Sequence, residues 1–344
     1  MKTVLVTGAA GFIGYHLSRA LLDEGFAVVG YDGMTEYYDV MLKRHRIDML
    51  RTHGHFTGIE AMLEDRARLE VAFAQHRPEI TVHLAAQAGV RYSIQAPETY
   101  FNSNLLGSFN LLECVRRHGT EHLLLGSTSS VYGSNETVPF GEGDMADHPL
   151  TFYAATKKAN EAMAHSYSHL WHLPTTMFRF FTVYGPWGRP DMALFKFVRS
   201  ILRDEPINIF NNGDMERDFT YIDDLVNSIR LLMDTVPPHP DDRSNPVKGD
   251  SLSPVAPYRV VNIGNAQPVQ LLDFVEEVER SLNRKAIRNY MEMQLGDAQR
   301  TWAKADLLRE LTGYQPNTPV AEGIRAFVAW YIDYYGVAPD RKSA

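Results

Sequence analysis

The stretch VLVTGAAGFIG, residues 4–14, decides the fold of this chain. It begins with a β-branched run, continues with Gly8, Gly11 and Gly14, and leads into the helix-period segment 14–25. Glycines between a strand and a helix allow a tight turn and a close approach of the backbone to a pyrophosphate, which the helix N-terminus then stabilises. The stretch therefore predicts a strand–turn–helix unit that binds a dinucleotide.

An acidic residue follows the next apolar run at the spacing that such a unit needs. Asp32 ends the segment FAVVGYD, 18 residues after Gly14. A carboxylate there can accept hydrogen bonds from a ribose 2′-hydroxyl and would repel a 2′-phosphate, so we expect NAD rather than NADP. The alternative is that Asp32 only begins a turn.

Short β-branched runs alternate with helix-period segments through the first half of the chain. The strand-like runs are KTVLVTG (2–8), FAVVGYD (26–32), ITVHLAA (80–86) and EHLLLGST (121–128), with amphipathic stretches between them. Alternation at this spacing predicts an α/β fold with a doubly wound parallel sheet of the Rossmann type.

The length of 344 residues fits roughly two domains of ~150 residues each. We expect a dinucleotide-binding domain over 1–182, to which parts of 220–265 return. Residues 183–344 are expected to form mainly a smaller C-terminal α/β lobe that binds the substrate. The Pro-, Asp- and Ser-rich segment 235–258 reads as a long exposed loop.

Composition limits the kinds of molecule that this chain is expected to bind. The formal net charge is −8 with scattered lysines and arginines, which disfavours a nucleic-acid surface but allows a local pocket for one small anion. The single cysteine, Cys114, cannot form an internal disulfide, and the dispersed histidines do not predict a metal site. The N-terminus reads as a strand rather than a signal peptide, and no apolar run approaches the ~20 residues of a membrane helix, so we expect a cytoplasmic protein without a membrane partner.

A second cluster carries acid–base chemistry. The hydroxyl residues 127–130 follow the apolar run 122–126, and Tyr153 and Lys157 stand at i and i+4 in FYAATKKANE. On a helix these two side chains share a face, and a nearby ammonium favours the phenolate of a tyrosine. With an upstream dinucleotide turn, this pattern predicts a catalytic tyrosine whose pKa is lowered by Lys157.

The motifs TGAAGFIG, STSSVYG and YAATK resemble the extended short-chain dehydrogenase/reductases, the NAD-dependent epimerase/dehydratase family, and the likeness covers nearly the whole chain. The resemblance implies tightly held NAD, a nucleotide-sugar substrate and a catalytic triad of Tyr153, Lys157 and Thr128. Met62 stands where the family usually has an acidic residue near adenine, and Leu63 could contact adenine through its backbone. Beyond the glycines, Asp32, Leu63 and the catalytic pair, the implied cofactor contacts are Phe12, Ile13, Leu84, Ala85, Ala86, Ala88 and Asn104.

Two later segments resemble the nucleotide-binding parts of the family. NNGDMERDFTYIDD implies that Arg217 contacts the diphosphate, for which a guanidinium is suited. QLGDAQRTWAKAD implies uridine contacts from Gln294 and Asp297, although Leu295 replaces a common proline. Either segment could instead be a surface turn. Ser129, in the hydroxyl cluster, is a further expected substrate contact.

The stretch FRFFTVYGPWGRPDMA and the insert EYYDVMLKRHRIDML (36–50) are similar to those of UDP-glucuronate 4-epimerases within this family. The resemblance implies reversible inversion at C4 of UDP-glucuronate, giving UDP-galacturonate through a 4-keto intermediate with Tyr153 as base. A planar carboxylate suits the rigid fork of an arginine, so we expect Arg189 to hold the sugar carboxylate and Thr182 to add a hydroxyl. The alternatives are a UDP-glucuronate decarboxylase, a UDP-glucose 4-epimerase and a non-catalytic NAD-binding sensor.

Two helix-period segments, 97–117 and 153–171, carry more apolar residues than one buried face needs. The family resemblance implies a homodimer through such helices, and burial in the core is the alternative. The residues in question are Phe101, Leu105, Met163, Tyr167 and Leu170.

Overall fold

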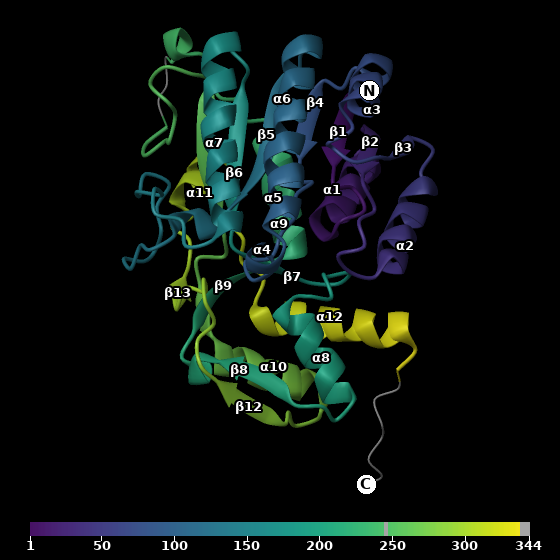
Figure 1. The fold of residues 1–344 in the computed structure, drawn as a ribbon, viewed down its shortest axis with the longest axis vertical. Coiled ribbons are helices and arrows are strands. Elements are labelled where there is room, and N and C mark those ends of the chain that lie inside the picture. The colour runs from purple at the N-terminus through teal and green to yellow at the C-terminus, as the bar shows by residue number, and fades with distance from the viewer. Residues whose placement is uncertain (244–246, 338–344) are drawn as a thin grey trace.

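A parallel sheet of seven strands, in the order β10-β6-β5-β4-β1-β2-β3, forms the centre of the computed structural model, which describes residues 1–243 and 247–337 (Figure 1). Neighbouring strands pair in parallel throughout. The strands are β1 (Thr3–Thr7), β2 (Ala27–Asp32), β3 (Phe56–Glu60), β4 (Ile80–His83), β5 (His122–Thr128), β6 (Thr175–Phe180) and β10 (Tyr258–Ile263). The predicted doubly wound α/β fold is confirmed.

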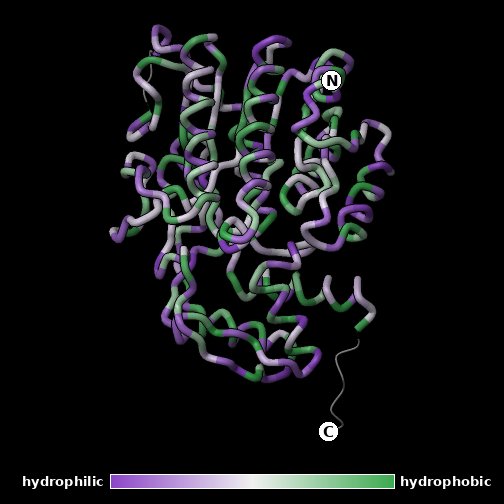
Figure 2. Tube along the Cα trace, viewed as in Figure 1, coloured by the Kyte–Doolittle hydropathy of each residue, from purple (hydrophilic) through white to green (hydrophobic). Residues whose placement is uncertain are grey.

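Helices cover both faces of this sheet, which explains why the inner strands β4 and β5 are buried along their whole length. Side chains of α1 (Phe12–Asp23), α2 (Val40–Arg51), α9 (Ile222–Met233) and α11 (Asp306–Thr312) form one core. Side chains of α3 (Arg66–His76), α6 (Gly107–His118) and α7 (Phe152–Trp171) form the other. Figure 2 shows hydrophobic and hydrophilic positions mixed along these helices, as expected where one side of each helix faces the sheet.

The start of α7 is fixed by a capping residue. Thr151 has an extended backbone, and its hydroxyl accepts a hydrogen bond from the Ala154 amide at 3.2 Å. The helix then places Tyr153 in its first turn and Lys157 one turn later. Its C-terminal end is marked by His172, which has a left-handed backbone.

A smaller lobe lies below the carboxyl ends of the strands (Figure 1). Its strand β9 (Glu216–Tyr221) pairs with β7 (Thr182–Tyr184), β11 (Pro268–Gln270) and β13 (Arg300–Thr301), and β8 (Ile207–Phe210) pairs with β12 (Arg288–Met291). Three helices pack around a core with stacked Phe219 and Phe274 rings, whose centroids are 4.1 Å apart. They are α8 (Ala193–Leu202), α10 (Leu271–Leu282) and α12 (Val320–Tyr335).

The stretch TTMFRFFTVYG, which reads as one continuous apolar run, is divided between the two sheets. Residues 175–180 form β6 in the large sheet, and 182–184 form β7 in the small one. The chain passes between them at Phe181, whose amide donates to the Ile263 carbonyl at 3.3 Å. This crossing places Thr182 and the following loop at the junction of the two sheets.

Helix α9 and strand β10, both within residues 220–265, lie with the large sheet, where the sequence expected part of that segment to return. The division of the chain into domains at 182/183 stays a prediction. Helix α11, farther along the chain, packs against α9 and β10 as well.

The segment 97–117, whose apolar residues follow helical periodicity, contains three helical pieces. These are α5 (Pro97–Tyr100), a π-helical turn at Phe101–Leu106 and α6, and the short helix α4 (Tyr92–Gln95) lies just before the segment. The wider turn changes which side chains face outward. Phe101 is 53% exposed and Leu170 of α7 is 58% exposed, so core burial is excluded for both. Met163 and Tyr167 pack partly buried against the sheet helices.

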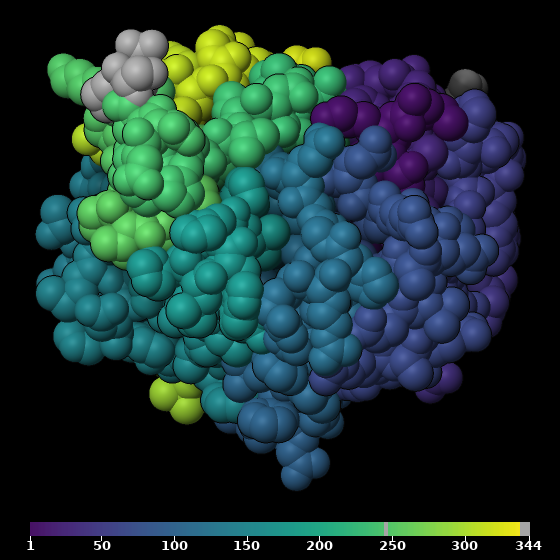
Figure 3. Space-filling view, turned by 90° about the horizontal axis from the view of Figure 1, so that it is seen from above, coloured from purple at the N-terminus to yellow at the C-terminus, as the bar shows by residue number. Residues whose placement is uncertain are grey.

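The Pro-rich segment 235–258 runs over the surface beside the C-terminal half of α7. Three histidines of this helix and its cap hold it: His165 bonds Ser253 at 2.7 Å, His169 bonds the Val255 carbonyl at 2.7 Å, and His172 bonds His239 at 3.0 Å. Figure 3 shows this green segment lying against the teal helix at one end of the molecule. Residues 244–246 of the predicted loop lie outside the described residues. In the described ranges, no helix has the length and apolarity that crossing a bilayer requires.

Candidate active site

A cavity of about 960 Å³ lies between the carboxyl ends of the large sheet and the smaller lobe. Loops after β1, β2, β4 and β5 line it on one side, and residues of α8 and β9 line it on the other. Ligands of doubly wound α/β folds bind at this end of the sheet. The cavity therefore has the position of an active site.

The glycine turn after β1 leaves its backbone open to the cavity. Gly8 has φ +75°, and a Cβ there would lie 2.9 Å from the Ala85 nitrogen. Helix α1 begins after Gly11 with no side-chain cap, so its first N–H groups are free to meet an anion. Phe12, Ile13 and Gly14 also line the cavity. This turn fits a pyrophosphate.

Asp32 stands at the end of β2, beside the glycine turn. Its carboxylate accepts hydrogen bonds from the amides of Ala10 at 3.0 Å and Met34 at 2.8 Å. Burial raises the pKa of Asp32, and these bonds and the charge of Lys43 oppose the rise. Since Asp32 lines the cavity, it is placed to accept a ribose hydroxyl there.

Most of the other predicted cofactor contacts line the same cavity, and one does not. Leu63, Leu84, Ala85, Ala86 and Ala88 face it, together with Met62. The Asn104 amide is instead fully buried and is not among the residues that line the cavity.

The hydrogen bonds of Asn104 explain its place. Its oxygen accepts from the Gln87 amide at 2.8 Å, and its nitrogen donates to the Gln87 carbonyl at 3.1 Å and to Thr156 at 3.0 Å. Asn104 therefore holds the loop after β4 against α7, and its contact with the cofactor stays a prediction.

We predict that Gly14→Ala removes the bound dinucleotide. An alanine Cβ would lie 2.0 Å from the Gly8 carbonyl oxygen, so the turn must open and the NAD content of purified protein should fall at least about tenfold. The matched control is Gly54→Ala, where a Cβ meets nothing within 4 Å and NAD content should not change. Absorbance and extraction of the purified proteins measure both. Equal NAD content in the two variants would contradict the assignment of this turn.

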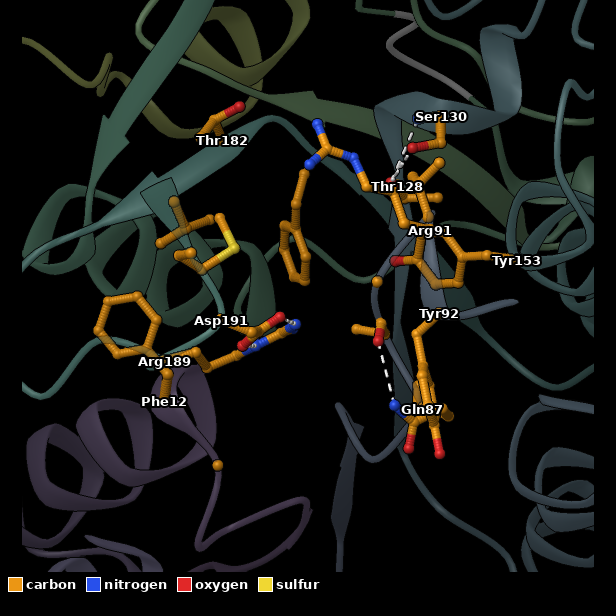
Figure 4. A pocket seen from close by; sticks show the side chains of 18 of the residues that line it. Phe12, Gln87, Arg91, Tyr92, Thr128, Ser130, Tyr153, Thr182, Arg189 and Asp191 are labelled. Atoms are coloured by element: carbon orange, nitrogen blue, oxygen red, sulfur yellow. Dashed lines mark hydrogen bonds and ion pairs between the residues drawn. The ribbon is translucent and has the colours of Figure 1, made fainter. Parts of the chain in front are cut away.

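The predicted triad converges at the carboxyl end of β5. Thr128 is the last residue of that strand, Tyr153 and Lys157 come from α7, and all three line the cavity. The Thr128 hydroxyl accepts from the Ser130 amide at 3.2 Å and bonds the Ser130 hydroxyl at 3.2 Å (Figure 4). Ser129 also lines the cavity.

The electrostatics of Tyr153 differ from the sequence expectation. Burial raises the pKa of Tyr153, while its hydrogen bond with Thr128 and the charge of Arg189 lower it. Lys157 is not among the groups that lower it. Burial takes the pKa of Lys157 itself down to about 8, against the opposing charge of Glu161. Desolvation is therefore the largest influence on the pKa of both groups.

Behind the triad, the buried ion pair between Glu161 and Arg179 fixes α7 relative to the strands β5 and β6. Glu161, one turn after Lys157, accepts from both Arg179 nitrogens at 2.9 and 2.8 Å and from the Ser127 hydroxyl at 2.7 Å. Ser127 precedes Thr128 on β5, so this contact sets the distance between Thr128 and α7.

The loop that carries Arg189 is tied to the glycine turn. The buried Arg46 donates to the Ala10 carbonyl at 2.8 Å and to the Trp187 carbonyl at 2.5 Å. His16 of α1 bonds the Pro186 carbonyl at 2.9 Å, and the Trp187 ring packs 5.3 Å from that of Trp330. These contacts hold the loop that carries Arg189 against α1 and α12.

Arg189 and Thr182 both line the cavity, and the guanidinium of Arg189 is already paired. Its Nε lies 3.0 Å from Asp191 Oδ1, and its Nη2 lies 2.5 Å from Asp191 Oδ2. In the view of Figure 4 this pair lies across the pocket from Tyr153 and Thr128. The sequence predicts that Arg189 holds the sugar carboxylate, and the structure shows that Asp191 already binds one edge of its guanidinium.

The expected nucleotide contacts have protein partners as well. Arg217 donates to the Gln299 carbonyl at 2.9 Å and to the Ala298 carbonyl at 2.5 Å, and burial lowers its pKa. Asp297 pairs with Arg91 at 2.7 Å. Arg217 and Asp297 line the cavity, whereas Gln294, at the start of the turn that leads to Asp297, is not among its lining residues.

Sequence reasoning missed six charged residues that line the cavity: Lys43, Glu64, Arg91, Asp191, Lys196 and Arg199. Arg91 follows β4 and stacks over Phe210, with its Cζ 4.2 Å from the ring centroid. Asp191 follows Arg189 by two residues, and its proximity in sequence was the available signal. In the described part of the chain, no group of three or more His, Cys, Asp or Glu residues is arranged to hold a metal ion.

Comparisons with known proteins agree with this geometry. Residues 4–244 match the NAD dependent epimerase/dehydratase family. A probable UDP-glucuronate 4-epimerase of Rhizobium meliloti (strain 1021) is 56% identical over 332 residues, which are 96% of this chain and 97% of that protein. UDP-glucuronate 4-epimerase 1 of Arabidopsis thaliana is 45% identical over 97% of this chain and 77% of its own length.

Among solved structures, UDP-glucuronic acid 4-epimerase from Bacillus cereus, in complex with UDP-glucuronic acid and NAD, superposes with a TM-score of 0.86. It is 30% identical, over 97% of this chain and all of that one. The family match spans the glycine turn, Thr128, Tyr153 and Arg189. Fold, cavity and sequence agree, and this chain belongs to the NAD-dependent epimerase/dehydratase family.

Proposed function

We propose that this enzyme reversibly converts UDP-glucuronate to UDP-galacturonate by inverting C4 of the sugar. The observation that carries the proposal is Arg189, a cation that lines the same cavity as Tyr153 and lowers its pKa. Asp191 leaves three N–H donors of this arginine free, and a sugar carboxylate can pair with them, whereas a neutral hexose offers them only hydroxyl groups. The names of the relatives in Rhizobium and Arabidopsis support the same substrate.

Tyr153 is the proposed base that takes the proton of the sugar 4-hydroxyl. The glycine turn and Asp32 would hold NAD, which would supply a reversible hydride acceptor for C4. Thr128 orients the 4-oxygen and favours the phenolate through its hydrogen bond with Tyr153. Lys157 comes from the next turn of α7, and we assign it to the ribose of the cofactor. When the hydride returns, Tyr153 gives its proton back to the 4-oxygen.

Inversion requires the ketone to present its opposite face before the hydride returns. We propose that the hexose turns about its diphosphate linkage while Arg217 and Asp297 hold the nucleotide. Arg217 would exchange its bonds to the carbonyls of residues 298 and 299 for bonds to the diphosphate. The segment that these bonds hold borders the cavity, so nucleotide binding and the position of this segment are linked.

The 4-keto intermediate carries a carboxylate two bonds from its ketone, so it can lose CO₂. That loss requires the C5–C6 bond to align with the carbonyl π system. Arg189 on its tethered loop is the proposed group that holds the carboxylate out of this alignment. The rigidity of the loop therefore protects the 4-keto intermediate from losing CO₂.

A substrate panel tests the proposal. Purified protein should convert UDP-glucuronate to UDP-galacturonate with at least about a hundredfold higher kcat/KM than it shows for UDP-glucose. Preference for UDP-glucose would identify a UDP-glucose 4-epimerase. Release of CO₂ as the main reaction would identify a decarboxylase, and NAD binding without turnover of any UDP-sugar would identify a sensor.

We also propose that the enzyme is a homodimer through α6 and α7. Apolar side chains remain exposed on this side of the molecule: Phe101, Phe109, Leu170 and Trp171 are each at least 39% exposed. Such a group of residues is typical of an interaction surface. Sedimentation equilibrium should give twice the chain mass of 39.0 kDa, and a monomer at micromolar concentration would contradict the proposal.

A further inference from the structure

The cation assigned to the sugar carboxylate already has an internal counter-ion. Asp191 binds the Nε edge of Arg189 with two hydrogen bonds, at 3.0 and 2.5 Å, and so uses two of the five N–H donors of the guanidinium. The remaining donors are on Nη1 and the outer side of Nη2. The two side chains are only 21% and 24% exposed, so solvent screens their pairing weakly.

Asp191 is itself held in place. The Tyr37 hydroxyl donates to its Oδ2 at 3.2 Å, and the turn that carries it is closed by the Met192 amide bonding the Arg189 carbonyl at 3.1 Å. The charge of Arg189 lowers the pKa of Asp191, which is therefore ionised at neutral pH. Asp191 also lines the cavity, on the side that Arg189 faces. A sugar carboxylate arriving at Arg189 meets a second negative charge.

This arrangement matters for a sugar that must turn. An unpaired guanidinium in a partly desolvated site would bind the carboxylate strongly in substrate, intermediate and product alike. Binding that is equally strong in all states lowers KM without raising kcat, and it would resist the rotation of the hexose. A nearby carboxylate reduces that attraction where the sugar carboxylate is bound to Arg189, and it does not affect the turning hexose, whose carboxylate has left the arginine.

We propose that Asp191 competes with the sugar carboxylate for Arg189 and thereby weakens its hold on the ground state, so that the hexose can turn. Asp191 acts through Arg189 and is therefore a positioning residue. The inference rests on the proposed function, because it requires a substrate with a carboxylate. The inference predicts that replacing Asp191 lowers both KM and kcat. It predicts this only for ligands that carry a carboxylate.

Binding is measured by calorimetry on NAD-loaded protein in the Tyr153→Phe background, where turnover does not interfere. Adding Asp191→Asn should tighten UDP-glucuronate about tenfold and change UDP-glucose and UDP by less than about twofold. With Tyr153 intact, Asp191→Asn should lower kcat for UDP-glucuronate about tenfold and lower KM with it. Asp191→Ala removes the same charge and serves if the asparagine variant does not fold.

Asp48→Asn is the matched control, because Asp48 is an exposed carboxylate of α2 that does not line the cavity, and its loss leaves Arg189 and Asp191 in place. Its ratio of UDP-glucuronate to UDP-glucose affinity should stay within about twofold of the parent. Unchanged or weaker UDP-glucuronate binding in the Asp191 variants, or an equal shift for all three ligands, overturns the inference. Failure of the proposed function has a different result, which is the absence of UDP-galacturonate with unsubstituted protein.

Discussion

Replacing Tyr153 by phenylalanine should reduce turnover of UDP-glucuronate by about 10³-fold and leave NAD and nucleotide-sugar binding within about twofold. The phenol is the proposed base for the 4-hydroxyl, and it lies in the cavity within hydrogen-bonding reach of Thr128. Phenylalanine keeps the ring and removes only the group that moves the proton. Steady-state kinetics and calorimetry on the same preparation separate the two effects.

The matched control is Tyr167→Phe on the same helix. The Tyr167 hydroxyl bonds Glu113 at 2.8 Å, away from the cavity, so its loss should leave kcat unchanged. If the Tyr153→Phe variant keeps more than a tenth of the turnover of the unsubstituted protein, another group is the base. Loss of NAD from that variant would instead assign Tyr153 to cofactor retention.

Arg189→His should change what the enzyme makes. Imidazole is shorter than the arginine side chain and cannot form the two-pronged pair with Asp191, so the sugar carboxylate is no longer held at a fixed angle. The 4-keto acid then reaches the alignment in which CO₂ is lost. We expect UDP-pentose products from at least about a tenth of the turnovers, against a trace with the unsubstituted protein.

Trapping of CO₂ and NMR of the sugar nucleotides measure this partition. Arg203→His is the control, since Arg203 is exposed at the end of α8 and does not line the cavity. An unchanged product spectrum with normal turnover in the Arg189 variant would remove this arginine from the protective role. Complete loss of substrate binding would make it an affinity determinant only.

The first half of the fold is readable from sequence because its signals are local. The glycine turn at 8–14 and the carboxylate at Asp32 each report a backbone requirement within one strand–turn–helix unit. The division of residues 175–184 between two sheets has no such signal. It depends on β10 and β9 pairing with β6 and β7, and these partners lie far away in the chain. The wide turn at Phe101–Leu106 is likewise invisible to helical periodicity.

The candidate site shows the same contrast between local sequence signals and contacts that form only in the folded chain. The spacing of Tyr153 and Lys157 sets their shared helix face, and the end of β5 sets Thr128, so the structure brings the predicted triad together. Charge balance is a property of the folded site. The pairing of Arg189 with Asp191, and the desolvation that raises the pKa of Tyr153, depend on surroundings that only the folded chain supplies. The hydrogen bonds of Asn104 with Gln87 and Thr156 likewise have no signal in the sequence.

The central claim is that one enzyme removes a hydride from C4 of UDP-glucuronate and returns it to the other face of the same molecule. UDP-glucuronate deuterated at C4, incubated with purified protein and no added NAD, tests this directly by NMR. The account predicts UDP-galacturonate that retains deuterium at C4, and no deuterium entering from D₂O when the substrate is unlabelled. Failure to form UDP-galacturonate, or formation with loss of the label to water, would contradict it.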